Sequence, residues 1–192
     1  MNGGGSGEVW PTDPRQDPGE EIVDLVDGGN RIVGRATRRD VRGQNLLHRG
    51  VGILCLNPRD QVHVHRRTDT KDVFPGMYDM FVGGVVLSGE TYDAAARREI
   101  AEELGIVELE PEYLFTHLYL GDRNRSWIQV YRVVWDGPVR LQPQEIVWGD
   151  WIEEEALHSM IGEKPFVPDG LEVYEHYLSW RGGPKYGRAG QV

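Results

Sequence analysis

Residues 84–106 constrain the fold of this chain more than any other stretch of its sequence. Apolar residues recur there every four positions, which predicts a helix over residues 92–104 with one face packed inward: Ala96, Ile100 and Leu104. Gly105 follows the last turn, where a left-handed helix cap favours glycine. A glycine-rich loop over residues 83–89 leads into the helix, and its missing side chains would let the backbone approach a ligand closely.

The predicted helix carries a cluster of three acids, Glu99, Glu102 and Glu103. They stand at positions i, i+3 and i+4, so their carboxylates share one face. Without a cation, each like-charged pair at such a spacing destabilises a helix by about 0.2–0.5 kcal/mol. Arg97 and Arg98 precede the cluster but are poorly placed to neutralise all three acids. A solvated acidic face is the commoner explanation of such a cluster. Beside a glycine-rich loop, however, these hard oxygen ligands suit Mg²⁺ or Mn²⁺, and we interpret the segment as a metal site.

Outside this segment the sequence alternates between strand and helix patterns. Strands are expected between turn signals at residues 22–26, 31–36, 51–56, 61–66, 112–120, 127–135 and 145–152. Helical patterns appear at residues 153–161 and 171–180. Strands outnumber helices and the helices are interspersed among them. The predicted fold class is therefore α/β, a sandwich in which a curved mixed sheet carries helices on its faces.

Two histidines, His63 and His65, alternate with valines in the strand expected at residues 61–66. Alternate residues of a strand point to one face, so both rings are expected on the same side of the sheet. Two such histidines could bind a transition metal, but no cysteine or third histidine lies close in sequence. We therefore interpret them as polar positions on a half-exposed strand.

The charge of the chain limits its partners. It has 31 acidic and 21 basic residues, a net charge of −10. A surface of this charge repels a nucleic-acid backbone, which argues against bulk nucleic acid as a partner. A small phosphorylated substrate stays compatible with it, because a few local cations and a bound metal can hold an anion on an acidic protein.

The 192 residues suffice for one domain with a substantial core. Residues 1–19 are rich in glycine and proline and are expected to form a disordered N-terminal tail, residues 20–180 the domain, and residues 181–192 a flexible C-terminal tail. No apolar run is long enough to span a bilayer and no secretion signal begins the sequence, so we expect a cytoplasmic protein with no membrane partner. The single cysteine, Cys55, lies in an apolar run and is expected to be a buried small hydrophobe.

Residues 84–106 resemble the Nudix box, Gly-x5-Glu-x7-Arg-Glu-U-x-Glu-Glu-x-Gly-U with U a bulky aliphatic residue, and every fixed position of that pattern is met. The wider resemblance runs from about Ile22 to Leu178. It implies a Nudix-type α/β/α sandwich. It also implies Mg²⁺- or Mn²⁺-dependent hydrolysis of a phosphoanhydride bond in a nucleoside diphosphate linked to another moiety, or in a related diphosphate. A homodimer is a further expectation, since dimers are common in the family.

The resemblance also implies roles for individual residues. The three glutamates of the acidic face match the metal-coordinating residues of the family, and the carbonyl of Gly83 is a further expected ligand. Glu90 and Arg98 match the pair that braces the loop at Gly84 against the helix. Water is expected to attack phosphorus while a carboxylate accepts its proton. Either Glu99 or Glu145 is a candidate for that base.

Residues 24–51 and 66–76 resemble the family branch related to isopentenyl-diphosphate isomerase. Residues that bind the substrate diphosphate in that isomerase align with Arg67 and Lys71, which implies a cationic cradle for a diphosphate here. A solvated basic loop is the alternative interpretation of these two residues.

The catalytic residues of the isomerase are mostly replaced in this sequence. Its catalytic cysteine falls at Gly83 and a metal-binding histidine at Val85, while the acids expected near residues 123–129 are absent; only His48 matches an isomerase metal ligand. A hydrolase is therefore favoured over an isomerase-like enzyme. A catalytically silent nucleotide-binding domain is a third hypothesis, and the intact glutamate cluster argues against it.

Overall fold

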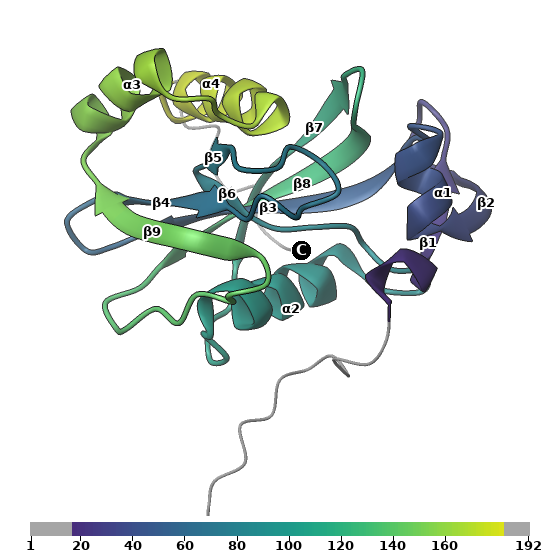
Figure 1. The fold of residues 1–192 in the computed structure, drawn as a ribbon, viewed down its shortest axis with the longest axis horizontal. Coiled ribbons are helices and arrows are strands. Elements are labelled where there is room, and N and C mark those ends of the chain that lie inside the picture. The colour runs from purple at the N-terminus through teal and green to yellow at the C-terminus, as the bar shows by residue number, and fades with distance from the viewer. Residues whose placement is uncertain (1–16, 183–192) are drawn as a thin grey trace, which may run out of the picture.

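The computed structural model describes residues 17–182, which form a mixed sheet with helices on both of its faces (Figure 1). The elements in chain order are η1 (Pro18–Glu20), β1 (Ile22–Val26), β2 (Ile32–Thr37), α1 (Arg38–Gly43), β3 (His48–Leu56), β4 (Val62–Arg67), β5 (Tyr78–Asp79), β6 (Phe81–Val82), α2 (Tyr92–Leu104), β7 (Glu112–Leu120), β8 (Arg125–Val134), β9 (Ile146–Ile152), α3 (Glu154–Glu163) and α4 (Pro168–Gly182).

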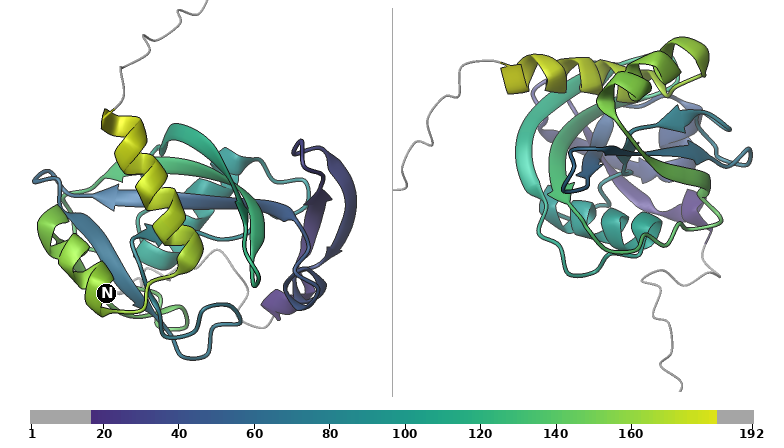
Figure 2. Two further views of the ribbon diagram at one scale, coloured as in Figure 1. Left: turned by 90° about the horizontal axis from the view of Figure 1, so that it is seen from above. Right: turned by 90° about the vertical axis from the view of Figure 1, so that its left-hand side faces the viewer.

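Strand β3 is the centre of the sheet. It pairs with β8 in parallel and with β1, β4 and β6 in antiparallel orientation. The outer pairs β1–β2, β7–β8, β4–β5 and β4–β9 are all antiparallel. The predicted mixed sheet is confirmed, and the views in Figure 2 show its curvature.

Two hydrophobic cores lie on opposite faces of β3, because successive side chains of a strand point to opposite sides. Val51, Ile53 and Cys55 pack against α2. Leu54 and Leu56 face the core that includes residues of α3 and α4. Figure 1 shows α2 below the sheet and α3 with α4 above it, which confirms the α/β/α sandwich. Cys55 is buried as predicted, and burial raises the pKa of its thiol to about 12.

The elements with strong periodicity lie where the sequence predicts them. Strands β1 and β7 and helix α2 have the predicted bounds, and the other predicted elements differ by a few residues at their ends. Helix α1 and the two-residue strands β5 and β6 were not predicted. Helix α1 buries one residue, Val41, so it shows no apolar stripe, and two residues are too few for an alternating pattern.

The prediction of a half-exposed strand at residues 61–66 is wrong, since His63 and His65 are both buried. Strand β9 pairs along most of β4, and the ring of Trp151 packs on the edge of His63 with centroids 5.2 Å apart. Burial lowers the pKa of His63 to about 4 and that of His65 well below its ordinary value, so both rings are neutral.

The predicted tails at residues 1–19 and 181–192 fall mostly outside the described residues. Of these two segments the structure describes residues 17–19, which include the start of η1, and residues 181–182, which end α4. Within residues 17–182, no helix is both long and apolar enough to cross a membrane.

Candidate active site

Helix α2 presents the predicted acidic face. Thr91 caps its first turn by accepting a hydrogen bond from the backbone N–H of Ala94 at 3.2 Å, and Gly105 ends it in the left-handed conformation with φ 69°. The apolar stripe predicted for this helix is buried against the sheet: Ala96, Ile100 and Leu104. These contacts fix the helix, and therefore also the direction of its glutamates.

The loop before α2 lies directly on those glutamates. A Cβ atom on Gly84 would collide with the carboxylate of Glu99, and one on Gly83 would collide with the carbonyl of Val51. The backbone N–H of Gly83 interacts with the carboxylate of Glu103 and partly offsets the rise in its pKa that burial causes. Val51 N–H donates to the Gly84 carbonyl at 2.9 Å, which ties the loop to β3. At Gly83 the backbone of β3 leaves no room for a side chain, whereas at Gly84 the space is occupied by the Glu99 carboxylate, which a side chain would displace.

Arg98 is at the centre of a hydrogen-bond network between the loop and the helix. Its Nε and Nη2 atoms donate to the two carboxylate oxygens of Glu90, each at 3.0 Å, and Nη2 also donates to the carbonyl of Val85 at 3.0 Å. Nη1 donates to Glu99 at 2.6 Å and to Glu102 at 3.3 Å. The bidentate contact with Glu90 has the geometry that a bracing pair requires.

The three glutamates share a region of buried negative charge. Glu99 and Glu103 are buried, and the Oε1 atom of Glu102 is buried without a hydrogen-bond partner. Burial, reinforced by the charge of Glu99, raises the pKa of Glu102 to about 7. Burial also raises the pKa of Glu103 to about 7, although Lys71 opposes that shift. A divalent cation would relieve this cost, so the donor set fits a metal of the Mg²⁺ class.

The carboxylates do not yet converge on one point. In the described part of the chain, no three His, Cys, Asp or Glu side chains are grouped as ligands of a metal ion. Arg98 holds Glu99 and Glu102 on its own guanidinium group instead. Metal binding here therefore requires these two side chains to turn away from Arg98.

The two cations predicted to bind a diphosphate, Arg67 and Lys71, lie near this acidic face and already have partners. Arg67 donates to the carbonyls of Val73 and Phe74, at 3.0 and 3.3 Å. Lys71 forms an ion pair with Glu145, the candidate base, and burial lowers the pKa of its ammonium group to about 8. Both cations help to lower the pKa of Glu103, so both act electrostatically at the acidic face.

Helix α1 supplies two further cations, Arg38 and Arg42, which the sequence analysis missed. Arg38 donates to Glu21 at 2.9 Å and interacts electrostatically with Glu99. Arg42 donates to Asn124 at 2.8 Å, and burial lowers the pKa of its guanidinium group to about 10. The arginine-rich stretch over residues 38–42 was the available signal, and only the fold shows that it faces the site.

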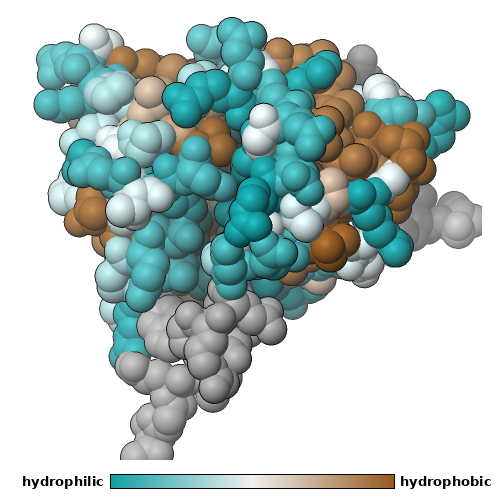
Figure 3. Space-filling model, turned by 45° about the vertical axis from the view of Figure 1, so that its right-hand side comes forward, coloured by the Kyte–Doolittle hydropathy of each residue, from teal (hydrophilic) through white to brown (hydrophobic). Residues whose placement is uncertain are grey.

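These groups line two adjoining hollows. An inner cavity of about 110 Å³ lies against Gly83 and Gly84, and a wider cleft of about 390 Å³ borders it. The two share four lining residues, namely Arg38, Arg42, Lys71 and Asp72. Figure 3 shows a face of the molecule where hydrophilic side chains predominate near the centre and hydrophobic ones gather toward the upper right.

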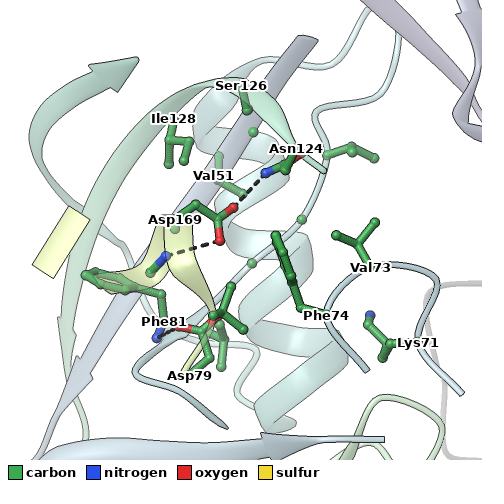
Figure 4. Close-up of a pocket in the computed structure, with 18 of the residues that line it drawn as sticks. Val51, Lys71, Val73, Phe74, Asp79, Phe81, Asn124, Ser126, Ile128 and Asp169 are labelled. Carbon is green, nitrogen blue, oxygen red and sulfur yellow. Dashed lines mark hydrogen bonds between the residues drawn. The ribbon is translucent and has the colours of Figure 1, made fainter. Parts of the chain in front are cut away.

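The inner cavity contains acids that the sequence did not suggest. Residues 123–129 supply no acid, as expected, but they contribute Asn124 and Ser126 to the cavity wall. The carboxyl groups of Asp79 and Asp169 enter from β5 and from the start of α4 (Figure 4). His48, which matches an isomerase metal ligand, lines the same cavity and contacts the carbonyl of Leu46 at 2.9 Å.

Sequence comparisons give the chain a family. The model of the NUDIX domain matches residues 46–177. An uncharacterized Nudix hydrolase of Streptomyces coelicolor is 47% identical over 173 residues, which cover 89% of this chain and 96% of that protein. The Nudix hydrolase YfcD of Escherichia coli is 37% identical over 154 residues, which cover 80% of this chain and 84% of that protein.

Solved structures agree with these matches. The crystal structure of DR0079 from Deinococcus radiodurans has a TM-score of 0.71 and 30% identity, and the match covers 81% of this chain and 98% of that one. The NUDIX domain of Shewanella oneidensis NrtR, solved with ADP ribose, shares the fold, with a TM-score of 0.54 and 19% identity over 69% of this chain and 86% of that one. Together with the intact box at residues 84–106, these matches show that the chain belongs to the Nudix hydrolase family, whose members cleave pyrophosphate bonds.

Proposed function

We propose that this chain is a divalent-metal-dependent hydrolase that cleaves a phosphoanhydride bond in a nucleoside diphosphate linked to another moiety. One observation supports this proposal above all others. The three carboxylates of α2 lie together under a glycine loop in which Gly84 leaves room for the Glu99 carboxylate, and Glu102 has a buried oxygen without a hydrogen-bond partner. An arrangement that costs folding free energy in the free protein gains from a bound cation.

The metal would be held by Glu99, Glu102 and Glu103 and by the carbonyl of Gly83. Mg²⁺ and Mn²⁺ both prefer such hard oxygen donors and bind phosphate oxygens alongside them. When bound, the metal would neutralise charge that develops on the phosphate and activate water for attack on phosphorus. Arg98 would keep the loop in place through Glu90 and the Val85 carbonyl while its contacts with the cluster are released.

The diphosphate would be held by the cations that border both hollows. Arg38 and Lys71 line the inner cavity and the outer cleft alike, and Arg67 lines the inner cavity. Phosphate would compete with Glu145 for Lys71, because each presents anionic oxygen to the same ammonium group. The net charge of −10 disfavours binding of a polymeric phosphate but is compatible with binding of a small phosphorylated substrate. The fold neighbour solved with ADP ribose supports a substrate of this size.

The proposal is tested with a panel of dinucleoside polyphosphates, nucleotide sugars, NADH, ADP-ribose, coenzyme A and prenyl diphosphates, each assayed with Mg²⁺ and with Mn²⁺. Phosphate-bearing products should appear only when a divalent cation is present. Glu102→Gln should lower turnover at least about 100-fold, since it removes a charged ligand and keeps the shape of the side chain. The control is Glu163→Gln, at the exposed end of α3. Equal turnover by both variants would rule out the proposed metal site.

The identity of the base is tested by comparing Glu145→Gln with Glu99→Gln. The carboxylate that accepts the proton should, when replaced, lower kcat at saturating metal and remove the acidic limb of the pH–rate profile. A carboxylate that only binds metal should instead raise the metal concentration needed for half-maximal activity. Glu145 is the better placed of the two to reach a water molecule at the diphosphate, because it lines the outer cleft.

A further inference from the structure

Two histidines meet on the face of the sheet that lies opposite α2. His117 belongs to β7 and His176 to α4, and Figure 1 shows α4 above the sheet. Their Nδ1 atoms are 3.1 Å apart, although the two residues are 59 positions apart in the sequence. The Nε2 atom of His117 contacts Oε1 of Glu172 at 2.8 Å, on the other side of the ring. These three side chains therefore form a polar cluster outside the candidate active site.

The hydrogen bonds of this cluster determine which nitrogen of His117 carries a proton. A carboxylate can only accept a hydrogen bond, so the Nε2 atom of His117 is protonated and donates to Glu172. In the neutral ring the Nδ1 atom is then an unprotonated acceptor, and it faces Nδ1 of His176. A metal ligand needs this tautomer, because imidazole binds a metal ion through its unprotonated nitrogen.

The surroundings of His117 are those of a histidine that binds a metal. Such a histidine almost always donates its other ring N–H to a carboxylate, a carbonyl or water, which orients the ring and makes the ligating nitrogen more basic. Glu172 supplies that carboxylate. Packing restrains the second ring, because Phe115 lies against His176 with ring centroids 4.2 Å apart. Both rings are therefore held in place before an ion binds.

The separation of the two Nδ1 atoms suits joint coordination of one ion. Zn–N bonds are about 2.0–2.1 Å long and zinc sites are mostly tetrahedral, which places two ligand nitrogens roughly 3.3–3.4 Å apart. The observed separation of 3.1 Å is close to that value, so a small outward turn of the rings makes room for an ion. His176 then carries its proton on Nε2, and the ion replaces the proton between the two rings.

We propose that His117 and His176 bind one transition-metal ion of the Zn²⁺ class through their Nδ1 atoms, with Glu172 orienting His117. Imidazole nitrogens suit Zn²⁺, Cu²⁺ and Ni²⁺, whereas Mg²⁺ prefers oxygen. Water completes the coordination, because the described part of the chain groups no three His, Cys, Asp or Glu side chains as metal ligands. The ion joins α4 to β7 and thereby stabilises the fold, on the side of the sheet away from the α2 glutamates.

The first test counts bound ions. The untagged chain is freed of metal with EDTA, transferred to buffer without it and titrated calorimetrically with Zn²⁺. The α2 glutamates can also take up Zn²⁺, so the wild type is compared with His117→Asn and should bind one ion more. Glu172→Gln keeps both ligands and should weaken the binding of that ion about 10- to 100-fold. The control is His158→Asn, at an exposed position of α3, which should bind Zn²⁺ as the wild type does.

The second test locates the ion by nitrogen NMR of the histidine rings. Zn²⁺ should shift the Nδ1 signals of His117 and His176 and leave the ring of His158 unchanged, whereas Mg²⁺ should shift none of them. Zn²⁺ should also raise the melting temperature of the wild type more than that of His117→Asn, because an ion that binds only the folded state stabilises it. The spectra need no variant, so they decide the question even if His117→Asn does not fold.

Three results would overturn the site. His117→Asn could bind as many Zn²⁺ ions as the wild type, Zn²⁺ could leave the Nδ1 signals of both rings in place, or Glu172→Gln could bind Zn²⁺ as tightly as the wild type. The first two exclude coordination by the histidine pair, and the third excludes the role of Glu172. Hydrolysis enters none of these measurements, so this site and the proposed function can fail separately.

Discussion

Two groups of acids lie next to the Gly83–Gly84 loop, namely the glutamates of α2 and the pair Asp79 and Asp169. They differ in the charged and polar groups that surround them. The glutamates of α2 are surrounded by cations, since Arg98 contacts two of them and Lys71 and Arg67 act on the third. Asp79 and Asp169 are close to one another, and burial raises the pKa of both. Burial raises the pKa of acids in both groups, so the groups differ in their surroundings. Cations contact the first group, which suits a metal and a charged diphosphate, whereas Asp169 accepts a hydrogen bond from Asn124 and Asp79 accepts one from the N–H of Phe81.

The largest expected effect comes from removing Arg98, the cation that contacts two of the α2 glutamates. Arg98→Ala leaves the buried Glu99 and the half-buried Glu90 and Glu102 without their shared partner, and losing one partner of a buried ion pair costs about 3–5 kcal/mol of stability. Urea unfolding in EDTA measures this cost. The matched control is Arg97→Ala, which breaks an exposed pair with Glu110 and should cost at most about 1 kcal/mol. Equal losses in the two variants would mean that the buried glutamates do not depend on Arg98.

A smaller effect is expected from replacing Asp79, an acid of the second group, by a side chain that is always neutral. Asp79→Asn mimics the protonated acid and keeps an oxygen to accept from the N–H of Phe81. The folded protein holds a proton on Asp79 up to a pKa of about 8, whereas the unfolded chain releases it above about 3.8. Stability contributed by this group therefore falls as pH rises between those values, by about 3 kcal/mol at pH 6.

The measurement is the difference in unfolding free energy between Asp79→Asn and the wild type at pH 4 and at pH 6. The variant should gain stability relative to the wild type as the pH rises. Asp122→Asn, at an exposed position, should show no such trend. A difference that stays constant over this range would mean that Asp79 is ionised in the folded protein, and the contrast between the two acid groups would disappear.

The same contrast explains which parts of the site the sequence could predict. Glu99, Glu102 and Glu103 lie within one helix turn, so their spacing alone places them on one face, and that helix has its predicted bounds. Asp79 and Asp169 are 90 positions apart along the chain. They meet because β5 runs beside the segment that precedes α4, where Val167 N–H donates to the Tyr78 carbonyl at 2.8 Å. A periodic pattern in the sequence cannot predict a contact between two positions so far apart.

Helix α1 was missed for a related reason. Its six residues bury only Val41, so stability comes from its cap at Thr37 and from contacts with other elements more than from an amphipathic pattern. The cations that it brings to the site, Arg38 and Arg42, are ordinary arginines in sequence. Their role depends on where β2 and β3 place the helix, and short-range patterns carry no information about that placement.

The smallest expected effect on the free energy of unfolding concerns His48, which also lines the cavity, and its pH dependence is opposite to that of Asp79. His48 is uncharged in the folded protein because burial and the charges of Arg42 and Arg38 lower its pKa to about 4, from about 6.5. The unfolded chain takes up a proton below pH 6.5, so stability contributed by this group is lost as the pH falls toward 4, by about 2 kcal/mol at pH 5. His48→Asn should remove that loss, so the variant should gain about 2 kcal/mol relative to the wild type between pH 7 and pH 5.

Its control is His158→Asn on the exposed side of α3, for which the difference from the wild type should be the same at both pH values. Between about pH 4 and pH 6.5 the opposite slopes of Asp79 and His48 largely cancel in the wild type, so replacing one of the two groups reveals the slope of the other. If the stability of His48→Asn relative to the wild type does not change between pH 7 and pH 5, the histidine is already protonated in the folded protein, and the contrast with Asp79 is wrong.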